Sequence, residues 1–553
     1  MKKNSLMGRR PRSAVVRAIA LLAMGWGSPG FFGVATAQSL PPTPGALLDG
    51  MEIRRPILPT GPAEVVFSKP ESAAAQARDG RRFLVKGFQF SGNKALSQGQ
   101  LRQVVERFVA LELTLTEVKK AADAVTAYYR NKGYPLAIAI VPTQRVDDGL
   151  VVVEVIEGRV GNLTFDGANR YSTALLQSYT RPLTDQPVIT MEALERSLLA
   201  LNDLPGLSAA ATLSAGQNRG ESDVVIKAKE SPFKVSFQVN NNGRTEAGAA
   251  RADLTLELPN PLGFGDQLVF RKMQAERGLL DYTQWKYSIP VGVKGARVAV
   301  SQSVAKYTIA GEFSALEIGG EVVTQEVSAT YPFARSRSRN IVGSIGVRET
   351  QTRQGALATP VSNNALSLLS VGGSANWVHQ DSSSTTASAV FTSNLRNNTN
   401  NEPTAVLGKL DLDVTHLTGV AAKWDFYFRG NGVVSGSSLP DSEKFSIGGP
   451  DSVRGFRSSE MRGDRGYLLT GEFRRQFVMG RSAGSVSVFH DMGAVTSLGF
   501  ASQDILTSAG VGMAWYPGRN SQVKVDVAWP LRHNLAKDPG PAPRTWVTAS
   551  ISF

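Results

Sequence analysis

The chain ends with the stretch Thr545-Trp546-Val547-Thr548-Ala549-Ser550-Ile551-Ser552-Phe553, in which apolar and polar side chains alternate. In an extended strand, successive side chains point to opposite faces, so every second residue shares a face. One face of this stretch is apolar and consists of Val547, Ala549, Ile551 and Phe553. The positions between them carry only hydroxyl side chains. The pattern predicts a β-strand, apolar on one side, that continues to the last residue.

The same period of two recurs from residue 233 to residue 553, where helical periodicity is absent. Examples are the runs 254–258, 410–414 and 424–428, each with apolar residues at alternate positions. A soluble β-sandwich gives the same local pattern, so alternation alone does not decide the fold. At roughly 20 residues for each strand and its turn, a region of this length has room for about 16 strands.

Further features favour a barrel embedded in a membrane. The terminal Phe553 resembles the signal by which bacterial outer-membrane barrels are recognised for insertion. No run of about 18 apolar residues follows the N-terminal region, so membrane-spanning helices are excluded. The expected fold is a transmembrane β-barrel of about 16 antiparallel strands at 232–553, preceded by two small periplasmic α+β domains. Aromatic residues lie near the ends of the expected strands, where an interfacial girdle would place them; they are Tyr282, Trp285, Tyr287, Trp377, Trp424, Trp515 and Tyr516.

Residues 1–37 have the composition of a secretory signal peptide. They contain basic residues and no acidic residue, an apolar stretch, and Ala35-Thr36-Ala37 as a cleavage site before Gln38. Part of the formal net charge of +13 therefore belongs to a removable segment. For that reason we do not interpret the charge as a nucleic-acid-binding surface.

The segment that follows, residues 38–81, is rich in proline. This composition predicts an arm or linker, because proline interrupts both helices and strands. One short helix, from Ala46 to Arg54, is possible within it and could plug a pore.

Residues 82–231 contain an internal repeat. A strand-like run, two amphipathic helical stretches and further strands occur at 82–158, and the series recurs at 159–231. Phe90 and Phe165 occupy corresponding places in the two units, 75 residues apart. This period is longer than that of solenoid repeats, so we predict two small α+β domains in tandem.

Two motifs in the barrel region carry charged residues in a specific context. The first is Val453-Arg454-Gly455-Phe456, preceded by Phe445-Ser446-Ile447-Gly448-Gly449. The second is Phe489-His490-Asp491-Met492-Gly493. The strand period places Val486 and Val488 on the lipid face, so Asp491 faces the lumen. From the residues alone, an exposed Arg454 and a hydrated Asp491 remain an alternative to a pair between them.

From about residue 83 to its end, the chain resembles the two-partner secretion transporters (TpsB) of the hemolysin secretion/activation type, within the wider outer-membrane insertase superfamily. The resemblance implies POTRA 1 at 82–158, POTRA 2 at 159–231 and a 16-stranded barrel at 232–553. It also implies that a loop around 440–460 folds back into the lumen.

The resemblance further implies roles for single residues. Arg454 is expected to pair with Asp491 through a bidentate contact that locks the loop to the barrel. Gly455 would allow a close approach to the wall, Phe456 would be an apolar anchor, and Phe553 would be the barrel assembly signal. The loop motif comprises Val453, Arg454, Gly455 and Phe456, and the barrel-wall motif comprises Phe489, Asp491 and Gly493.

The function that the resemblance implies is export of a protein. The POTRA domains would recognise an unfolded exoprotein, an adhesin or a hemolysin, through its N-terminal secretion domain, and the barrel would pass it to the cell surface. The expected location is the bacterial outer membrane, with the N-terminal domains in the periplasm. Other expected partners are outer-membrane lipids and the barrel-assembly machinery, but no nucleic acid. Alternatives are an outer-membrane protein insertase and a solute uptake channel.

The sequence offers little for catalysis. It contains no cysteine, which excludes disulfides, thiolate nucleophiles and iron–sulfur clusters. No two of its histidines have the spacing of metal ligands. Neither G-x-S-x-G nor a Walker A sequence is present. We expect no enzyme activity, no cofactor and no metal site. The histidines are His379, His416, His490 and His533.

Overall fold

The computed structural model describes residues 41–48, 51, 65–67, 82–146, 148–395, 407–499, 503–533, 535 and 542–553. The predicted signal peptide at 1–37 lies outside these residues. Within the described ranges, every helix is too short or too polar to span a bilayer.

The N-terminal arm contains a short helix, α2 (Pro44–Leu48). We expected a helix from Ala46 to Arg54, and of that range the structure describes 46–48 and 51. The helix begins at a proline because the first helical position needs no N–H donor and favours the φ angle that proline fixes.

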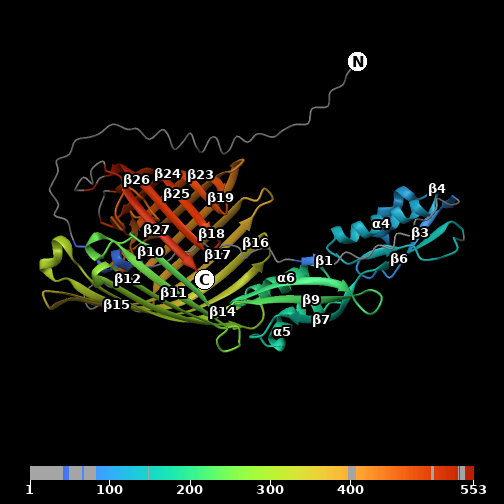
Figure 1. Cartoon of the computed structure of the whole chain (residues 1–553), viewed down its shortest axis with the longest axis horizontal. Helices are drawn as coiled ribbons and strands as arrows, with labels where there is room; N and C mark the ends of the chain where they lie inside the picture. The colour runs from blue at the N-terminus through green and yellow to red at the C-terminus, as the bar shows by residue number, and fades with distance from the viewer. Residues whose placement is uncertain are drawn as a thin grey trace, which may run out of the picture. The chain divides into compact units, whose positions relative to one another are not determined.

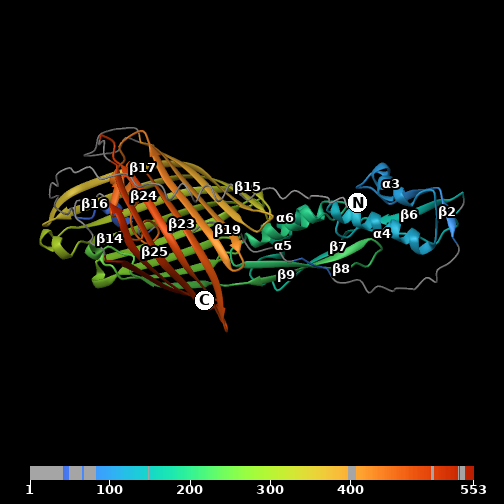
Figure 2. The ribbon, with the colours of Figure 1, turned by 90° about the horizontal axis from the view of Figure 1, so that it is seen from above.

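The first α+β domain (blue and cyan in Figure 2) has β6 at the centre of a three-stranded sheet, parallel to β3 and antiparallel to β5. Helix α4 begins with a capping box, in which Thr114 and Glu117 each accept a hydrogen bond from the other's main-chain N–H. Val118 and Val125 on its apolar face belong to the same buried cluster as Phe90 of the sheet. The elements are β2 (Phe83–Val85), β3 (Gly87–Ser91), α3 (Gln98–Val105), η1 (Glu106–Phe108), β4 (Leu111–Leu113), α4 (Leu115–Asn131), β5 (Ile138–Ile140) and β6 (Leu150–Ile156).

The second α+β domain has a four-stranded sheet in the order β1-β8-β9-β7. Strand β1 (Val65–Phe67) comes from the arm and pairs in parallel with Ala211, Thr212 and Leu213 of β8. The arm therefore occupies one edge of this sheet. The other elements are β7 (Arg159–Asp166), α5 (Thr173–Thr184), α6 (Met191–Asn202), β8 (Leu207–Ala215) and β9 (Glu221–Glu230).

The two domains use a carboxylate in the same way. Glu157 accepts a hydrogen bond from the main-chain N–H of Lys94 at 2.7 Å. Glu230 accepts one from the main-chain N–H of Arg170 at 2.9 Å and one from that of Tyr171 at 3.2 Å. Each carboxylate lies at or just after the end of the last strand of its domain, and it holds the loop that follows β3 in the first domain and β7 in the second. The shared contact supports an internal repeat.

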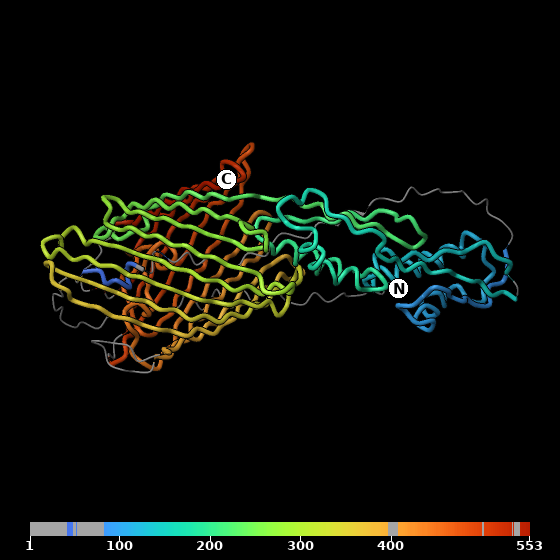
Figure 3. The backbone as a smooth tube through the Cα atoms, turned by 90° about the horizontal axis from the view of Figure 1, so that it is seen from below, coloured from blue at the N-terminus to red at the C-terminus, as the bar shows by residue number. Residues whose placement is uncertain are grey.

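Sixteen strands of the described chain close into an antiparallel barrel, which confirms the predicted fold (Figures 1 and 3). Each strand pairs with the next one, except that β20 pairs with β23, because β21 and β22 belong to the loop between them. The barrel strands are β10 (Lys234–Asn240), β11 (Arg251–Pro259), β12 (Gln267–Ala275), β13 (Leu280–Val291), β14 (Ala296–Thr308), β15 (Gly319–Arg335), β16 (Arg339–Ala356), β17 (Thr359–Val378), β18 (Ser384–Asn394), β19 (Gly408–Ala421), β20 (Trp424–Ser435), β23 (Arg465–Met479), β24 (Ser482–Thr496), β25 (Asp504–Gly518), β26 (Ser521–His533) and β27 (Arg544–Ser552).

The outer face of the barrel is apolar. On β24, Val486 and Val488 are 45% and 53% exposed, whereas Phe489 and Asp491 are buried. A large exposed apolar surface is unfavourable in water, and an outward apolar band is the arrangement of a barrel in a bilayer. Similar exposed positions on other strands include Leu254, Phe270, Val327, Val371 and Leu412.

The barrel closes between its first and last strands, β10 and β27. The N–H of Phe553 donates to the carbonyl oxygen of Val235 at 2.8 Å, and the N–H of Val235 donates to the carbonyl oxygen of Phe553 at 3.2 Å. Backbone hydrogen bonding therefore extends to the last residue, as the terminal alternation predicts. The side chain of Phe553 is exposed.

Candidate functional site

The site is the connection between β20 and β23, residues 436–464, which we call the lumen loop. It contains η5 (Asp441–Glu443) and a small hairpin of β21 (Phe445–Ile447) and β22 (Met461–Gly463). Asp464, the last residue of the loop, accepts a hydrogen bond from the main-chain N–H of Leu439 at 2.7 Å and so joins the two ends of the loop. Its other oxygen accepts one from the main-chain N–H of Leu498, in the connection after β24, at 2.7 Å. Asp464 is buried, and sequence reasoning did not identify it.

At the tip of the lumen loop, the structure brings Arg454 and Asp491 together. Nε of Arg454 donates to Oδ2 of Asp491 at 2.9 Å, and Nη2 donates to Oδ1 at 2.9 Å. The main-chain N–H of Arg454 donates to the same carboxylate at 3.2 Å. Arg454 is 3% exposed and Asp491 is fully buried. A planar guanidinium and a carboxylate in this fork geometry form one of the stronger pairs available to a protein.

The tip also contacts strands on either side of β24. Nη1 of Arg454 lies 3.4 Å from a carboxylate oxygen of Glu472 on β23 and 3.6 Å from one of Asp526 on β26. The indole Nε1 of Trp546 on β27 donates to the carbonyl oxygen of Arg454 at 2.8 Å. Sequence reasoning missed these three residues. The alternation that placed Asp491 inward places Glu472 and Asp526 inward too, but gives no reason to choose them.

The three carboxylates around Arg454 differ in the number of their basic partners. Glu472 also pairs with Arg474 at 3.0 Å, and Asp526 also pairs with Lys524 at 2.8 Å. Among the described residues, Asp491 has Arg454 as its only basic partner. Loss of the Arg454 side chain would leave Asp491 buried with only neutral donors, the hydroxyls of Thr470 and Ser508 and a main-chain N–H, and an uncompensated buried charge is costly.

The two motif glycines lie where a side chain has no room. A Cβ on Gly455 would lie 2.8 Å from the Cβ of Ser508 and 2.9 Å from the main-chain nitrogen of Pro530. A Cβ on Gly493 would lie 2.9 Å from Cγ2 of Ile447. Both glycines therefore allow the lumen loop to approach the barrel wall closely.

The apolar residues of the motifs surround the ion pair. Val453, Phe456 and Phe489 are all buried. The guanidinium carbon of Arg454 lies 3.2 Å from the centre of the Phe489 ring, in a cation–π contact. Phe456 packs edge-on against His533, with ring centres 6.0 Å apart. These contacts exclude water from the pair and strengthen it.

The lumen loop also holds the arm, through Asp441. Its carboxylate accepts hydrogen bonds from the main-chain N–H of Gly45 at 2.8 Å and from the hydroxyl of Thr43 at 3.0 Å. Arg462, on the same loop, pairs with Asp441 at 2.8 Å and donates to the hydroxyl of Thr43 at 2.9 Å. Asp441 therefore joins the start of α2 to the loop.

The other side of the arm packs on the inner wall of the barrel. Leu47 and Met51 are buried in a cluster with Met273 and Tyr282 of the wall. Nη1 of Arg271, on β12, donates to the carbonyl oxygen of Met51 at 2.6 Å. A polar cavity of about 250 Å³ remains between the start of α2, residues 440–442 and the inner faces of β16 and β17.

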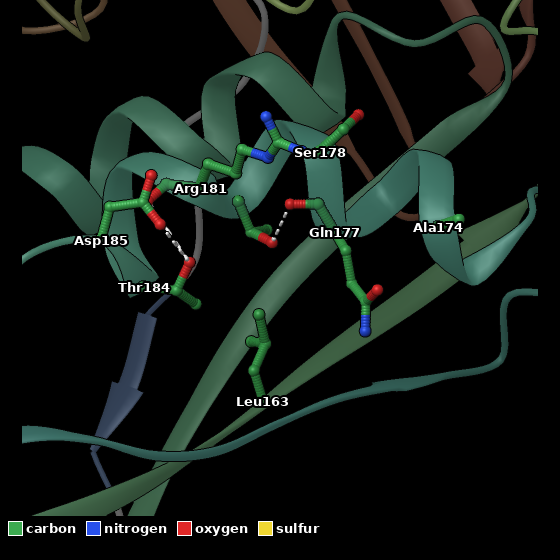
Figure 4. A pocket seen from close by; sticks show the side chains of 8 residues that line it. Leu163, Ala174, Gln177, Ser178, Arg181, Thr184 and Asp185 are labelled. Carbon is green, nitrogen blue, oxygen red and sulfur yellow. Dashed lines mark hydrogen bonds between the residues drawn. The ribbon is translucent and has the colours of Figure 1, made fainter.

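A second cavity, of about 490 Å³, lies in the second α+β domain between α5 and β7 (Figure 4). Leu163 comes from β7, Gln177 and Arg181 come from α5, and Asp185 directly follows α5. It is a groove with an apolar base and a polar rim.

Across the described residues, no cluster of His, Cys, Asp or Glu has the geometry of a metal site.

Comparisons with known proteins agree with this architecture. The family model described as haemolysin secretion/activation protein ShlB/FhaC/HecB matches residues 220–515, and the model described as POTRA domain, ShlB-type, matches residues 83–158. The heme/hemopexin transporter protein HuxB of Haemophilus influenzae is 24% identical over 557 residues, which cover 96% of this chain and 97% of HuxB.

Two solved structures are similar in fold. CdiB from Escherichia coli superposes with a TM-score of 0.69 at 20% identity and covers 88% of this chain and 93% of its own. CdiB from Acinetobacter baumannii superposes with a TM-score of 0.61 at 14% identity and covers 94% of this chain and 95% of its own. At these identities the structures show the fold alone.

Proposed function

The chain belongs to the haemolysin secretion/activation protein family ShlB/FhaC/HecB, and we propose how its parts carry out secretion. It is an outer-membrane transporter of the two-partner secretion type, with periplasmic POTRA domains. In our proposal, the POTRA domains capture an unfolded exoprotein, and the barrel conducts it to the cell surface when the lumen loop moves.

The observation that carries the proposal is the contact between Arg454 and Asp491. A fork-shaped ion pair with both distances at 2.9 Å keeps the tip of the lumen loop against the wall. An extended polypeptide needs the space that the loop and α2 occupy. The pair therefore acts as the lock of the closed pore, and export requires that it open.

Capture of the exoprotein uses the edges of the POTRA sheets. An extended chain can add to a sheet edge through main-chain hydrogen bonds, which depend only partly on sequence. Strand β8 spans Leu207–Ala215, and the described residues of β1 pair with Ala211 to Leu213. A segment of exoprotein that pairs along the full length of β8 would form more main-chain hydrogen bonds than these three pairs supply, and in our proposal it displaces β1. The groove between α5 and β7 adds a second surface for side chains.

The direction of export follows from where folding occurs. The exoprotein stays unfolded in the periplasm and folds after it leaves the barrel, so the step is irreversible without a nucleotide. We propose an adhesin or a hemolysin as the cargo. A very long exported repeat protein in the neighbouring reading frame would identify it.

The test is secretion of that exoprotein from cells that produce the transporter. Deletion of residues 83–231 should abolish binding of the exoprotein's N-terminal domain and its appearance at the surface, while a folded barrel remains in the outer membrane. Retained binding would place recognition elsewhere. Unchanged surface levels of other barrel proteins would separate secretion from an insertase role.

A further inference from the structure

The base of the lumen loop carries a second buried charge cluster, which joins Glu443 to wall residues 95 and 34 positions away in the chain. Glu443 of η5 is 4% exposed. Its Oε1 accepts a hydrogen bond from Nη2 of Arg348 on β16 at 2.5 Å, and its Oε2 pairs with Nζ of Lys409 on β19 at 2.9 Å. Lys409 also donates to the carbonyl oxygen of Glu443 at 3.3 Å. Each carboxylate oxygen therefore has a basic partner on a different strand.

This cluster is independent of the tip. Arg454 contacts β23, β24, β26 and β27, whereas Glu443 contacts β16 and β19. The two sets of strands occupy separate parts of the barrel order, with β20 between them. The lumen loop therefore contacts the wall at two separate places.

The charges around Glu443 indicate that its carboxylate fixes the base of the loop to the wall through ionic contacts, and does not merely fill space. A buried carboxylate is stable only when opposite charges and hydrogen bonds replace its hydration. The side chain of Lys409 is 12% exposed and that of Arg348 is 26% exposed, so both cations are also partly removed from water. If the base of the loop left the wall, Arg348 and Lys409 would lose the carboxylate that they share. The closed position of the loop is therefore favoured by a contact that depends on charge.

We propose that Glu443 is a positioning residue of the export pore, which, with Arg348 and Lys409, anchors the base of the lumen loop across the lumen, separately from the tip lock. The proposal rests on the proposed secretion function. Asp441, in the same short helix, accepts a hydrogen bond from the start of α2. Movement at this anchor therefore also weakens the contact between the loop and the arm. The tip lock and the base anchor must both open before the lumen clears.

The test compares Glu443→Gln with Glu460→Gln in the full-length chain. Glu460 is a matched control, because it is a loop carboxylate that pairs with Arg457, which is also in the loop. A single cysteine introduced by Ser442→Cys reports the position of the base, since Ser442 lines the lumen cavity and the chain has no other cysteine. The measurement is the rate at which an impermeant maleimide labels this cysteine on intact cells.

We expect Glu443→Gln to label about tenfold faster than the parent, because loss of charge-assisted hydrogen bonds shifts a local opening equilibrium by about that factor. Glu460→Gln should label at the parent rate. Lys409→Gln should reproduce the effect from the barrel side. The double variant Glu443→Gln/Lys409→Gln should exceed neither single variant, which a general loss of stability would not produce.

Equal labelling of Glu443→Gln and Glu460→Gln would overturn the proposal, as would additive effects in the double variant. If Glu443→Gln does not accumulate as a folded barrel, Lys409→Gln carries the same comparison. The labelling assay needs no exoprotein, so it tests the base anchor separately from the proposed secretion function. If the parent fails to secrete, the proposed function is wrong; if the parent secretes but labelling is unchanged, only the anchor is wrong.

Discussion

Trp546, on the last strand, donates its indole N–H to the main-chain oxygen of Arg454 at the tip of the lumen loop, 2.8 Å away. Trp546 is 4% exposed and Arg454 is 3% exposed, so the bond is shielded from water. The strand that closes the barrel against β10 is therefore joined directly to the loop tip. Barrel closure and loop position are linked by one hydrogen bond.

Trp546→Phe should loosen the loop tip, because it removes the indole N–H while an aromatic ring still fills most of the space. A buried hydrogen bond contributes about 1 kcal/mol, so the open fraction of the pore should rise roughly fivefold. Single-channel recording in planar bilayers measures this fraction. Trp529→Phe is the control, because Trp529 is exposed on the outer face of β26. Equal recordings for the two variants would mean that the bond has no part in closure.

Arg454→Ala should increase conductance, because the loop tip would lose the ion pair that holds it against the wall. It should also reduce export, because a tip without this pair has no fixed position in the lumen and can obstruct the passing chain. Arg454→Lys should lie between the parent and Arg454→Ala, since an ammonium keeps the charge but not the planar fork. The exchange Arg454→Asp/Asp491→Arg should restore little, because an acid at the tip would face Glu472 and Asp526, now 3.4 and 3.6 Å from Arg454. Full recovery in the exchanged variant would show that those two acids do not act on the tip.

Gly455→Ala should displace the tip, because the new methyl group would lie 2.8 Å from the Cβ of Ser508. Overpacking of this kind costs about 1–3 kcal/mol, which should appear as a larger open fraction. Gly436→Ala changes the same loop at a place where a Cβ meets no atom within 4 Å. Conductance should rise for the first variant and stay at the parent level for the second.

POTRA 1 should depend on a hydrogen bond between Tyr129 and Glu157. The hydroxyl of Tyr129 donates to Oε1 of Glu157 at 2.8 Å. Tyr129→Phe should lower the local stability of this domain by about 1.5–3 kcal/mol, the contribution of a hydrogen bond to a charged group. Hydrogen exchange of the amides of β3 and β6 measures the loss, and Tyr128→Phe, on the same helix, is the control.

The buried, hydrogen-bonded Tyr129 also makes the stability of POTRA 1 depend on pH. Burial, followed by the hydrogen bond to Glu157, raises the pKa of Tyr129 above its usual value. The folded domain therefore favours the neutral phenol, so its stability is complete below pH about 10 and falls as the pH rises further. Protection of β3 and β6 should decrease above that pH in the parent and decrease less in Tyr129→Phe.

The barrel could be predicted because its signal is local and repeated. Alternation along each strand, and the length of the region, are enough to predict about 16 strands, and the same parity indicates which way Asp491 points. The start of α2 at Pro44 was missed because a proline inside a Pro-rich stretch was treated only as a breaker.

The rest of the site depends on contacts that no local pattern contains. Glu443 and Arg348 are 95 residues apart, and Trp546 and Arg454 are 92 residues apart. They meet because the barrel curves back on itself and the loop crosses its interior. The motifs indicate Arg454 and Asp491. The anchor of one acid and two bases comes from separate parts of the chain, so it forms no motif of fixed spacing in the sequence.

The central claim is that the lumen loop must leave the wall for export to occur, and a disulfide tests it most directly. An ideal Cβ on Gly493 lies 3.3 Å from the Cβ of Ile447, near the separation of about 3.5–4.5 Å found in disulfides. Ile447→Cys also removes the methyl group that crowds Gly493, and the chain has no cysteine of its own. The measurement is the amount of exoprotein exported by Ile447→Cys/Gly493→Cys cells before and after reduction. We predict that export stops while the disulfide is formed and resumes on reduction; undiminished export with the disulfide intact would contradict the account.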